Sequence, residues 1–379
     1  MRKSISIRAP FEAISGYGQI IYNLFNNENL FDYDIQFYST RPISDLSKHN
    51  ISKTVIERLK DDYQKDRPNI ELLIHPIQMN QEQSNIFSHI PYSKNRLFFT
   101  MWETDRITEY WAYIMSTKCI SVITPNQWNI DAFEKEGVTV PMQKCPLFAN
   151  DIYQYKTPQN NDKLIIGISS SVIDERKNIL PFINKFNESF QNNDNVELWV
   201  KTTKSNVSKI PKYLNKNLKI FAQSFDTEEL MNWYHSIDVL VSPTKSEGWG
   251  MMQHEAMMCG RPVMCAHYGG LLEFVNEKNS IPIKFNEEFP EDTYFAYSNG
   301  RWANPDLDDC MNKIKWCMRN KHKLIHMGIE AHNSVKHLTL KNTINTLNSI
   351  IADYAENIDL SSSDKKSDKG LPKSNKRTK

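Results

Sequence analysis

Two glutamates, Glu247 and Glu255, stand eight positions apart in the most glycine-rich stretch of the chain. Residues 242–270 contain five of the twelve glycines, which are Gly248, Gly250, Gly260, Gly269 and Gly270. Glycine is favoured where the backbone takes a positive φ or comes close to a ligand. Two carboxylates beside such a backbone can accept hydrogen bonds from ligand hydroxyl groups. The stretch therefore predicts a ligand-binding site.

The elements around these glutamates indicate how both could face one ligand. Residues 238–242 are predicted to form a strand, 243–249 a tight loop and 250–259 a helix. The first N–H groups of that helix lack partners, so they could receive a diphosphate or a sugar hydroxyl. Glu247 would face the ligand from the loop, and Glu255 in the second helical turn suits a ribose cis-diol. Either glutamate alone could instead compensate the helix dipole, but the whole constellation favours a site.

Strand-length apolar runs alternate with amphipathic helical segments along most of the chain. The first series of predicted strands comprises 4–9, 34–38, 70–74, 97–101 and 120–123, with helices at 17–26, 104–115 and 127–137. The second series comprises strands at 164–168, 196–201, 218–221, 238–241, 263–266 and 281–284, with helices at 179–190 and 228–235. This alternation is typical of α/β proteins with parallel sheets. We predict two doubly wound, Rossmann-like domains that face a central cleft.

A polar linker at 153–162 sets the predicted domain boundaries. Residues 1–155 form the first domain and 156–335 the second, and a helix at 336–357 is expected to pack back on the first. Residues 358–379 are predicted to be a disordered basic tail, because 361–379 carry seven Lys and Arg against two Asp. For this tail a solubilising role is favoured over contact with nucleic acid or a membrane surface.

Composition and short motifs exclude several classes of protein. No apolar run reaches the ~20 residues that a spanning helix needs, and the first residues lack a signal-peptide core. We expect a cytoplasmic protein, with peripheral membrane association as the alternative. The six cysteines form no C-x-x-C pair, so buried reduced thiols are expected. His254 and Glu255 begin like the zinc motif H-E-x-x-H, but Met258 takes its last position. Asp306 and Asp308 match the D-x-D pattern of a metal-dependent transferase fold but are expected to cap a helix.

The stretch 238–275 resembles part of a known enzyme family. Its signature runs are Ser246-Glu-Gly-Trp-Gly, Glu255-Ala-Met, Cys259-Gly-Arg-Pro-Val and Gly269-Gly-Leu-Leu-Glu273. These resemble the E-x7-E region of retaining nucleotide-sugar glycosyltransferases of the GT-B fold, the family 4 group also called glycosyl transferases group 1. Two other runs, Ala13-Ile-Ser-Gly-Tyr-Gly-Gln19 and Glu175-Arg-Lys-Asn178, resemble donor-binding segments of the same family.

The resemblance implies a role for each matched residue. Glu247 would contact the donor sugar, Glu255 would hold the ribose, and Arg176 with Lys177 would neutralise the departing diphosphate. Such cations favour a transition state in which the leaving group gains negative charge. The other implied donor contacts are Gly16, Tyr17, Gly18, Ser246, Gly248, Trp249 and Gly250. No metal is implied, and no cofactor other than a nucleotide-sugar co-substrate such as a UDP- or GDP-sugar.

The chain departs from the family pattern at two places near the predicted cleft. Glu103 stands close to the position where many relatives have a histidine, so it is our candidate for a catalytic polar contact. Alternatively, Glu103 begins a helix together with Thr104 and Asp105. The arginine that usually accompanies the first strand of the second domain is missing, and serines occupy 169–171.

We predict a retaining, metal-independent glycosyltransferase that moves a hexosyl or pentosyl group from a nucleotide-diphosphate donor to an acceptor hydroxyl. A glycan or glycolipid acceptor is favoured. Two alternatives stay open: an acceptor that is a macromolecule, such as a hydroxylated DNA base or a protein, and a GT-B protein that binds nucleotide sugar without catalysis. We further expect that Glu247→Ala removes transfer and leaves the fold intact.

Overall fold

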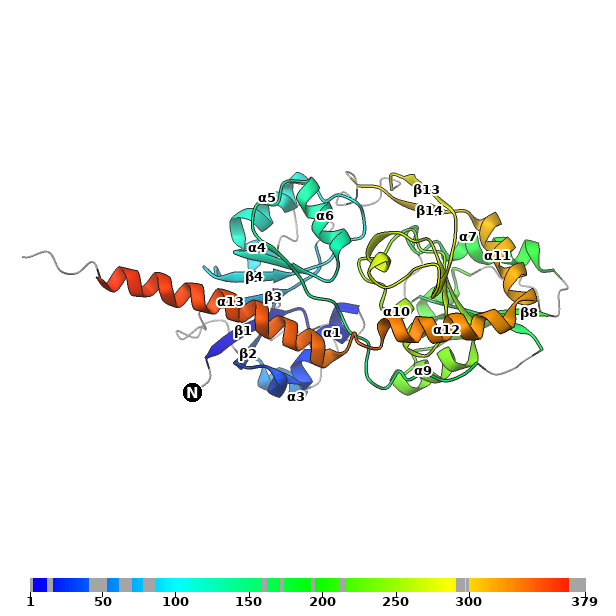
Figure 1. Ribbon diagram of the computed structural model, residues 1–379, viewed down its shortest axis with the longest axis horizontal. Coiled ribbons are helices and arrows are strands. Elements are labelled where there is room, and N and C mark those ends of the chain that lie inside the picture. Colours follow the sequence, from blue (N-terminus) through cyan, green and yellow to red (C-terminus); the bar gives the residue numbers. More distant parts are fainter. Residues whose placement is uncertain are drawn as a thin grey trace, which may run out of the picture.

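The computed structural model contains two six-stranded parallel sheets, each in a lobe of its own (Figure 1). The first sheet has the strand order β2-β1-β3-β4-β5-β6, and the second has β12-β11-β10-β7-β8-β9. All neighbouring strands in the two sheets run parallel. The structure describes residues 3–11, 16–40, 53–60, 70–77, 86–158, 162–170, 174–191, 195–210, 216–290, 297 and 300–367, with side chains up to 356. The predicted pair of doubly wound α/β domains is confirmed.

The elements of each domain have the following bounds. The strands of the first sheet are β1 (Ser4–Ala9), β2 (Asp34–Ser39), β3 (Glu71–Ile74), β4 (Arg96–Phe99), β5 (Ser121–Thr124) and β6 (Met142–Lys144). Its helices are α1 (Gly16–Asn26), η1 (Glu28–Leu30), α3 (Lys53–Arg58), α4 (Ile86–His89), α5 (Glu109–Lys118) and α6 (Gln127–Lys135). The second sheet has β7 (Leu164–Ser169), β8 (Val196–Thr202), β9 (Leu218–Ala222), β10 (Val239–Ser242), β11 (Val263–Cys265) and β12 (Ser280–Pro282). The remaining helices are α7 (Ile179–Ser189), α8 (Lys204–Val207), α9 (Thr227–Ser236), α10 (Met251–Met258), η3 (Gly269–Glu273), α11 (Leu307–Arg319), α12 (Lys321–Val335) and α13 (Leu340–Ser367).

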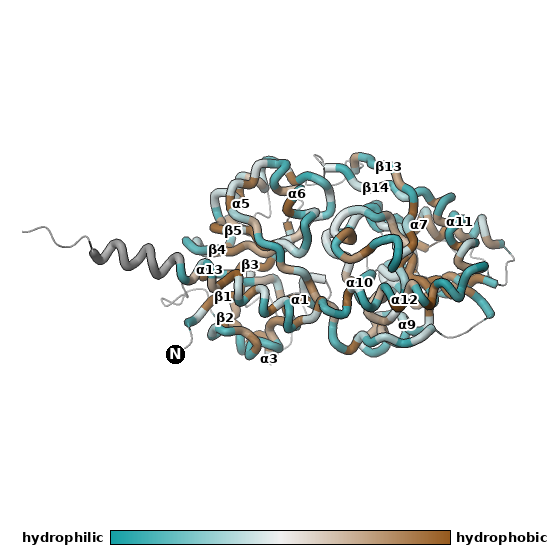
Figure 2. The backbone as a smooth tube through the Cα atoms, in the orientation of Figure 1, coloured by the Kyte–Doolittle hydropathy of each residue, from teal (hydrophilic) through white to brown (hydrophobic). Residues whose placement is uncertain are grey.

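The central strands of both sheets are covered on both faces. Every residue of β3, β4, β5, β7 and β10 is buried. Parallel sheets require such cover, so their strands read as nearly continuous apolar runs rather than alternating ones. Figure 2 shows this hydrophobic character along the strands of the first sheet. One buried cluster also crosses between the domains, since Trp102 and Trp111 of the first pack with Tyr268 and Trp302 of the second. The walls of the cleft therefore rest on a shared core.

The predicted helix at 104–115 begins too early. Helix α5 starts at Glu109, and the side chain of its N-cap Thr108 accepts a hydrogen bond from Trp111 N. Before it, the buried Trp102 Nε1 donates to Thr104 Oγ1 and to the carbonyl of Arg106, both at 2.7 Å. These bonds hold residues 102–106 as a loop, which a local helix signal could not reveal.

Three strands were not predicted from the sequence. They are β6 and the antiparallel pair β13 (Phe285–Glu288) with β14 (Trp302–Pro305). Arg301, the residue before β14, contacts the first domain, because its N donates to Asp105 Oδ1 at 2.6 Å. A pairing of four-residue strands so far apart in the chain leaves no short-range hairpin signal.

Helix α13 leaves the second lobe and packs along the first (Figure 1). The side-chain amide of Asn348 holds the helix to the first domain through two hydrogen bonds. Its Oδ1 accepts from Asp32 N at 3.2 Å, and its Nδ2 donates to Leu30 O at 3.3 Å. Thr343 Oγ1 donates to Pro146 O at 2.8 Å. The helix continues to Ser367, ten residues into the range 358–379 expected as a tail, and residues 368–379 lie outside the described part of the chain.

The structure tests two expectations from the sequence, the state of the cysteines and the absence of a spanning helix. All six cysteines are free and buried, as the spacing predicted. Burial raises the pKa of the Cys119 and Cys265 thiols to about 12, so they stay protonated and weakly reactive. Within the described part of the chain, none of the helices combines the length and the apolar character required to cross a bilayer.

Candidate active site

The glycine-rich loop ends where α10 begins, at the carboxyl end of β10. Gly250 is the N-cap of α10 and has a φ of 93°, which a residue with a side chain rarely adopts. Met251 is the first helical residue, so Glu255 lies in the second turn as predicted. Gln253 Nε2 donates to Ser242 Oγ at 2.6 Å and ties the helix to the strand. The sequence thus predicted this strand, loop and helix within one residue.

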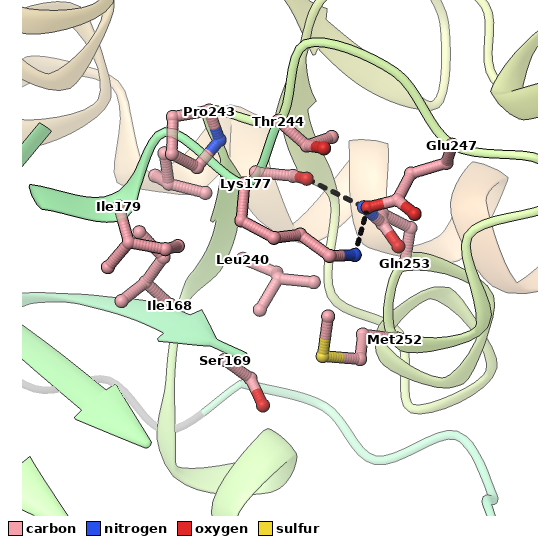
Figure 3. A pocket seen from close by; sticks show the side chains of 12 residues that line it. Ile168, Ser169, Lys177, Ile179, Leu240, Pro243, Thr244, Glu247, Met252 and Gln253 are labelled. Atoms are coloured by element: carbon pink, nitrogen blue, oxygen red, sulfur yellow. Dashed lines mark hydrogen bonds and ion pairs between the residues drawn. The ribbon is translucent and has the colours of Figure 1, made fainter. Parts of the chain in front are cut away.

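Glu247 lines a small cavity at the ends of β7 and β10, where Figure 3 shows its contact with Lys177. Its Oε1 accepts a hydrogen bond from Lys177 Nζ at 2.6 Å, and its Oε2 accepts one from Arg176 Nη1 at 3.1 Å. Glu247 is only 7% exposed. Burial by itself would raise the pKa of this carboxyl, but the Lys177 and Arg176 charges lower it to about 2. The carboxylate is therefore ionised, and its charge is already compensated by protein groups.

Arg176 links this cavity to the first domain. Its Nη1 also donates to Ser246 O at 2.8 Å, and its Nη2 lies 4.0 Å from Glu103 Oε1. Glu103 Oε2 accepts from Tyr297 OH at 3.2 Å, and the Ser246 hydroxyl donates to the Glu103 carbonyl. Glu103 stands in the loop before α5, so the alternative that it begins a helix is wrong. The structure places it beside Arg176 at the boundary between the domains.

Two glycines of the glycine-rich stretch, Gly269 and Gly270, serve contacts within the protein. Gly269 has a φ of 69°, and a Cβ there would lie 2.5 Å from Ser246 Oγ and 2.9 Å from Glu247 O. A Cβ on Gly270 would overlap the Gly248 carbonyl, and Gly270 N donates to Glu247 O at 2.7 Å. The close approach that glycine permits is thus between η3 and the loop. These residues fix the backbone on which Glu247 stands.

We expect Gly269→Ala to lower the free energy of unfolding by about 3 kcal/mol, because strain at a positive φ adds to a steric clash. Gly137→Ala is the matched control, since Gly137 has a φ of 82° but no atom within 4 Å of a built Cβ. That variant should lose only about 1 kcal/mol, the cost of the backbone strain. Urea unfolding of both variants measures the difference. Equal losses would show that the packing of Gly269 against the loop contributes nothing.

A cavity of about 330 Å³ opens between the two domains. The first domain contributes Gly16, Gln19, Asn23, Phe148 and Asn150 to its lining. The second contributes Ser169, Lys201, Thr203, Phe225, Asp226, Met251, Met252 and Glu255, among others. These second-domain residues follow the carboxyl ends of β7, β8 and β9 or open α10, where a doubly wound fold binds its ligands.

Glu255 faces this larger cavity from α10. Its Oε2 accepts a hydrogen bond from Tyr234 OH at 2.9 Å. Burial raises the pKa of the Glu255 carboxyl to about 7, against the lowering effect of Tyr234, Tyr153 and Lys201. Glu247 lines the neighbouring small cavity instead. The two glutamates that the sequence assigned to one ligand therefore occupy adjoining cavities.

The other expected donor contacts divide into those at the cavity and those in the core. Gly16 lines the cavity, but Gly16, Tyr17 and Gly18 form the first turn of α1 rather than a loop. Tyr17 OH accepts from Met101 N at 3.0 Å, and Gly18 is buried. Residues 12–15 of the expected loop lie outside the described residues.

The resemblance implied a donor contact through the backbone of residues 248–250, and the side chain of Trp249 lies in the core. Trp249 is 1% exposed. Its Nε1 donates to His254 Nδ1 at 3.3 Å, and its ring lies 5.3 Å from that of Phe274. An indole ring offers a large apolar surface for packing and a single N–H donor. In Trp249 both are engaged inside the core, by Phe274 and by His254. The buried Trp249 side chain therefore anchors the glycine-rich loop to the core of the second domain.

A family model described as Glycosyl transferases group 1 matches residues 163–293, which contain β7 to β12 and both glutamates. These residues are a glycosyl transferases group 1 domain. Sequence matches to curated relatives fall in a short part of the chain. D-inositol 3-phosphate glycosyltransferase 2 of Catenulispora acidiphila is 38% identical over 60 residues, 16% of this chain and 14% of the relative. Sulfoquinovosyl transferase SQD2 of Arabidopsis thaliana is 29% identical over 117 residues, 31% of this chain and 20% of the relative. The matched segments thus span no more than a fifth of either relative.

Solved structures resemble most of the chain. A glycosyltransferase from Rickettsia africae superimposes with a TM-score of 0.66 at 13% identity, covering 94% of this chain and 99% of that one. Anabaena HepE in complex with UDP and glucose gives a TM-score of 0.60 at 12% identity, covering 94% and 100%. At such identities the likeness shows the fold, which is GT-B.

Several residues around the group 1 domain were missed by sequence reasoning. Asn126 of the first domain donates from Nδ2 to Gly248 O at 2.6 Å and so holds the loop from across the cleft. Tyr153 and Tyr234 bracket Glu255 from distant parts of the chain, so no local pattern marks them. Lys201 lines the cavity at the end of β8. Its position as the last residue of the predicted strand 196–201 was the signal that could have found it.

The acidic residues of the described structure do not form an evident metal site. Across the residues that the structure describes, no group of three or more His, Cys, Asp or Glu side chains could hold a metal ion. Asp306 Oδ1 accepts from Asp308 N at 2.9 Å and from Asp309 N at 3.0 Å. The D-x-D pattern is therefore a helix cap, as predicted.

Proposed function

We propose that the protein transfers a sugar from a nucleoside-diphosphate donor to an acceptor hydroxyl with retention of configuration. The observation that carries this proposal is the cavity of about 330 Å³ between the domains, which Glu255 and the first turn of α10 line from the group 1 domain. The ionised Glu255 carboxylate can accept two hydrogen bonds from a ribose diol. The N–H groups that open α10 favour an anion such as a diphosphate. Binding of both parts in one cavity matches a nucleoside diphosphate.

The state of Glu247 supports a reaction on one face of the sugar. A retaining glycosidase uses a free carboxylate as nucleophile, with the second carboxyl about 5 Å away. Glu247 is instead held by Lys177 and Arg176, which compensate its charge. A paired carboxylate is a weak nucleophile, but it can still contact the donor sugar and stabilise positive charge at its reacting carbon. Deprotonation of the acceptor hydroxyl then falls to the leaving phosphate.

The donor and acceptor classes are proposed from the relatives. The HepE structures contain UDP, glucose or UDP-glucose, and a TarM structure contains UDP with α-GlcNAc-glycerol. Another neighbour is a lipopolysaccharide outer core galactosyltransferase. We propose a UDP-hexose as the first donor to test, and a glycan or glycolipid hydroxyl as the acceptor.

A donor panel tests the proposed function. We expect one of the UDP-, GDP- and dTDP-sugars to release its nucleoside diphosphate in the presence of sugar and glycolipid acceptors, with the anomeric configuration of the product retained by NMR. Saturable donor binding without turnover would favour the non-catalytic alternative. Absence of binding by every donor in calorimetry would contradict the proposed function.

A further inference from the structure

The cavity between the domains is lined by a lysine, Lys201, to which the proposed function assigns no role. Lys201 is the sixth residue of β8 and lies opposite Ser169, the last residue of β7, in the parallel register. Ser170 N donates to Lys201 O at 3.1 Å, so the backbone beneath this side chain is fixed by the sheet. Lys201 and Ser169 both line the 330 Å³ cavity. A sheet position of this kind places the ammonium on rigid backbone rather than on a loop.

The Lys201 ammonium is incompletely compensated. Its pKa is lowered by burial, and the Glu255 charge opposes this only in part. Among the described residues no carboxylate lies within 4 Å of it, in contrast to Lys177 and Lys245, which each form ion pairs. Its Nζ lies 5.5 Å from the Phe225 ring centroid, a weak contact for a cation. A partly buried charge without a paired carboxylate favours an anionic ligand.

The cations that the sequence assigned to the diphosphate are placed differently. Lys177 and Arg176 are both bound to Glu247, and neither lines the larger cavity. Breaking a buried ion pair is strongly unfavourable, so their release to a ligand is costly. Among the described residues that line the cavity, Lys201 is the only Lys or Arg, and Asp226 and Glu255 are the only acids. Asp226 is already used as the N-cap of α9.

We propose that Lys201 binds the diphosphate of the donor. An ammonium is a compact point charge that suits a phosphate oxygen. The first turn of α10 lines the same cavity through Met251 and Met252, so its N–H groups and Lys201 can share one anion. This inference rests on the proposed function, because it assigns a contact to its donor.

The test separates the phosphate contact from contacts to the nucleoside. Calorimetry measures the Kd of UDP, GDP and dTDP, and of the corresponding nucleosides, for the unmodified protein and for Lys201→Met. Methionine keeps an unbranched side chain of nearly the same length and removes the positive charge. We expect the Kd of the bound nucleoside diphosphate to rise about 10- to 100-fold, as for loss of a charge-assisted hydrogen bond. The Kd of the nucleoside should stay within about two-fold.

Two further variants complete the test. Lys201→Arg keeps the charge and should restore most of the affinity for the diphosphate. Lys204→Met removes an exposed lysine three residues away that does not line the cavity, and should leave both Kd values unchanged. Thermal unfolding of each variant checks that it is folded.

The outcomes distinguish this inference from the proposed function. Unchanged diphosphate affinity in Lys201→Met, or an equal loss for nucleoside and diphosphate, overturns the role of Lys201 alone. A loss as large in Lys204→Met overturns it too, because the effect would then come from net charge. Failure of the unmodified protein to bind any of the three nucleoside diphosphates overturns the proposed function itself.

Discussion

Glu247→Ala is expected to lower the free energy of unfolding by about 3–5 kcal/mol, the usual cost of removing one partner from a buried ion pair. The change leaves the Lys177 and Arg176 cations without the carboxylate that each contacts within 3.1 Å. The sequence led us to expect an intact fold for this variant, and the burial of Glu247 adds the expectation that the fold is less stable. Urea unfolding measures the loss. Transfer should also be lost, because the carboxylate that we propose to contact the donor sugar is removed.

The control for this prediction is an exposed pair of the same kind. Glu57 lies 3.7 Å from Lys53 on α3, and the two side chains are 64% and 91% exposed. Exposed helix pairs contribute about 0.3–0.5 kcal/mol, so Glu57→Ala should change stability little. If Glu247→Ala cost no more than Glu57→Ala, the buried pair would have no role in stability.

A double variant isolates the pairwise term. Lys177→Met in the Glu247→Ala background removes one of the two uncompensated cations, so the double variant should be more stable than the sum of the single losses predicts. Strict additivity would indicate that Glu247 acts through something other than Lys177.

The pH dependence of this pair has a defined sign. The folded pKa of Glu247 is lowered to about 2 from an ordinary value of 4.5. Its contribution to stability is therefore complete above about pH 4.5 and is lost as the pH falls towards 2. Acid unfolding of Glu247→Ala should lack this component, which a comparison of stability at pH 6 and pH 3 measures.

Glu255→Gln is expected to act in the opposite direction on stability. Burial raises the folded pKa of Glu255 to about 7 from 4.5, so the native protein holds this proton more tightly than the unfolded chain does. The contribution of Glu255 to the free energy of unfolding therefore falls as the pH rises from about 4.5 to 7. Glutamine stays neutral and can still accept the Tyr234 hydroxyl. We expect Glu255→Gln to be more stable than the unmodified protein by about 3 kcal/mol at pH 8 and equal to it at pH 4.

The titration of Glu255 should also make donor binding depend on pH. The ribose diol is bound by the carboxylate form, so the donor KM should fall as the pH rises through 7. In Glu255→Gln the KM should be raised and independent of pH in this range. Glu57→Gln, an exposed change of the same type, is the control and should keep the normal profile. A pH-dependent KM in Glu255→Gln would assign the titration to another group.

Much of the frame could be predicted from local patterns. Apolar runs marked most strands because a strand in a parallel sheet is buried on both faces. Gly250 marked the start of α10 because the left-handed backbone there excludes most other residues. Asp306 marked the start of α11, since a side chain that caps a helix lies next to it in sequence. Each of these features depends on residues that are near neighbours in the chain.

The errors have a common cause in long-range contacts. Residues 102–106 form a loop because of bonds among Trp102, Thr104 and Arg106 and because Arg301 binds Asp105 from the second domain. The sequence made no prediction for the Trp249 side chain, which lies in the core because Phe274 packs against it. Helix propensity and motif matching register neither kind of contact.

The sequence by itself determined that Glu247 and Glu255 stand on a loop and a helix at the end of a strand in the second of two α/β domains. Only the tertiary structure decided what each carboxylate meets. Lys177 and Arg176 compensate Glu247, whereas Tyr234 and Tyr153 surround Glu255 in the cavity that Lys201 shares. The physical reason is that charge compensation and burial depend on atoms brought together from distant parts of the chain. Eight residues of spacing fix the positions of two carboxylates but not their protonation or their partners.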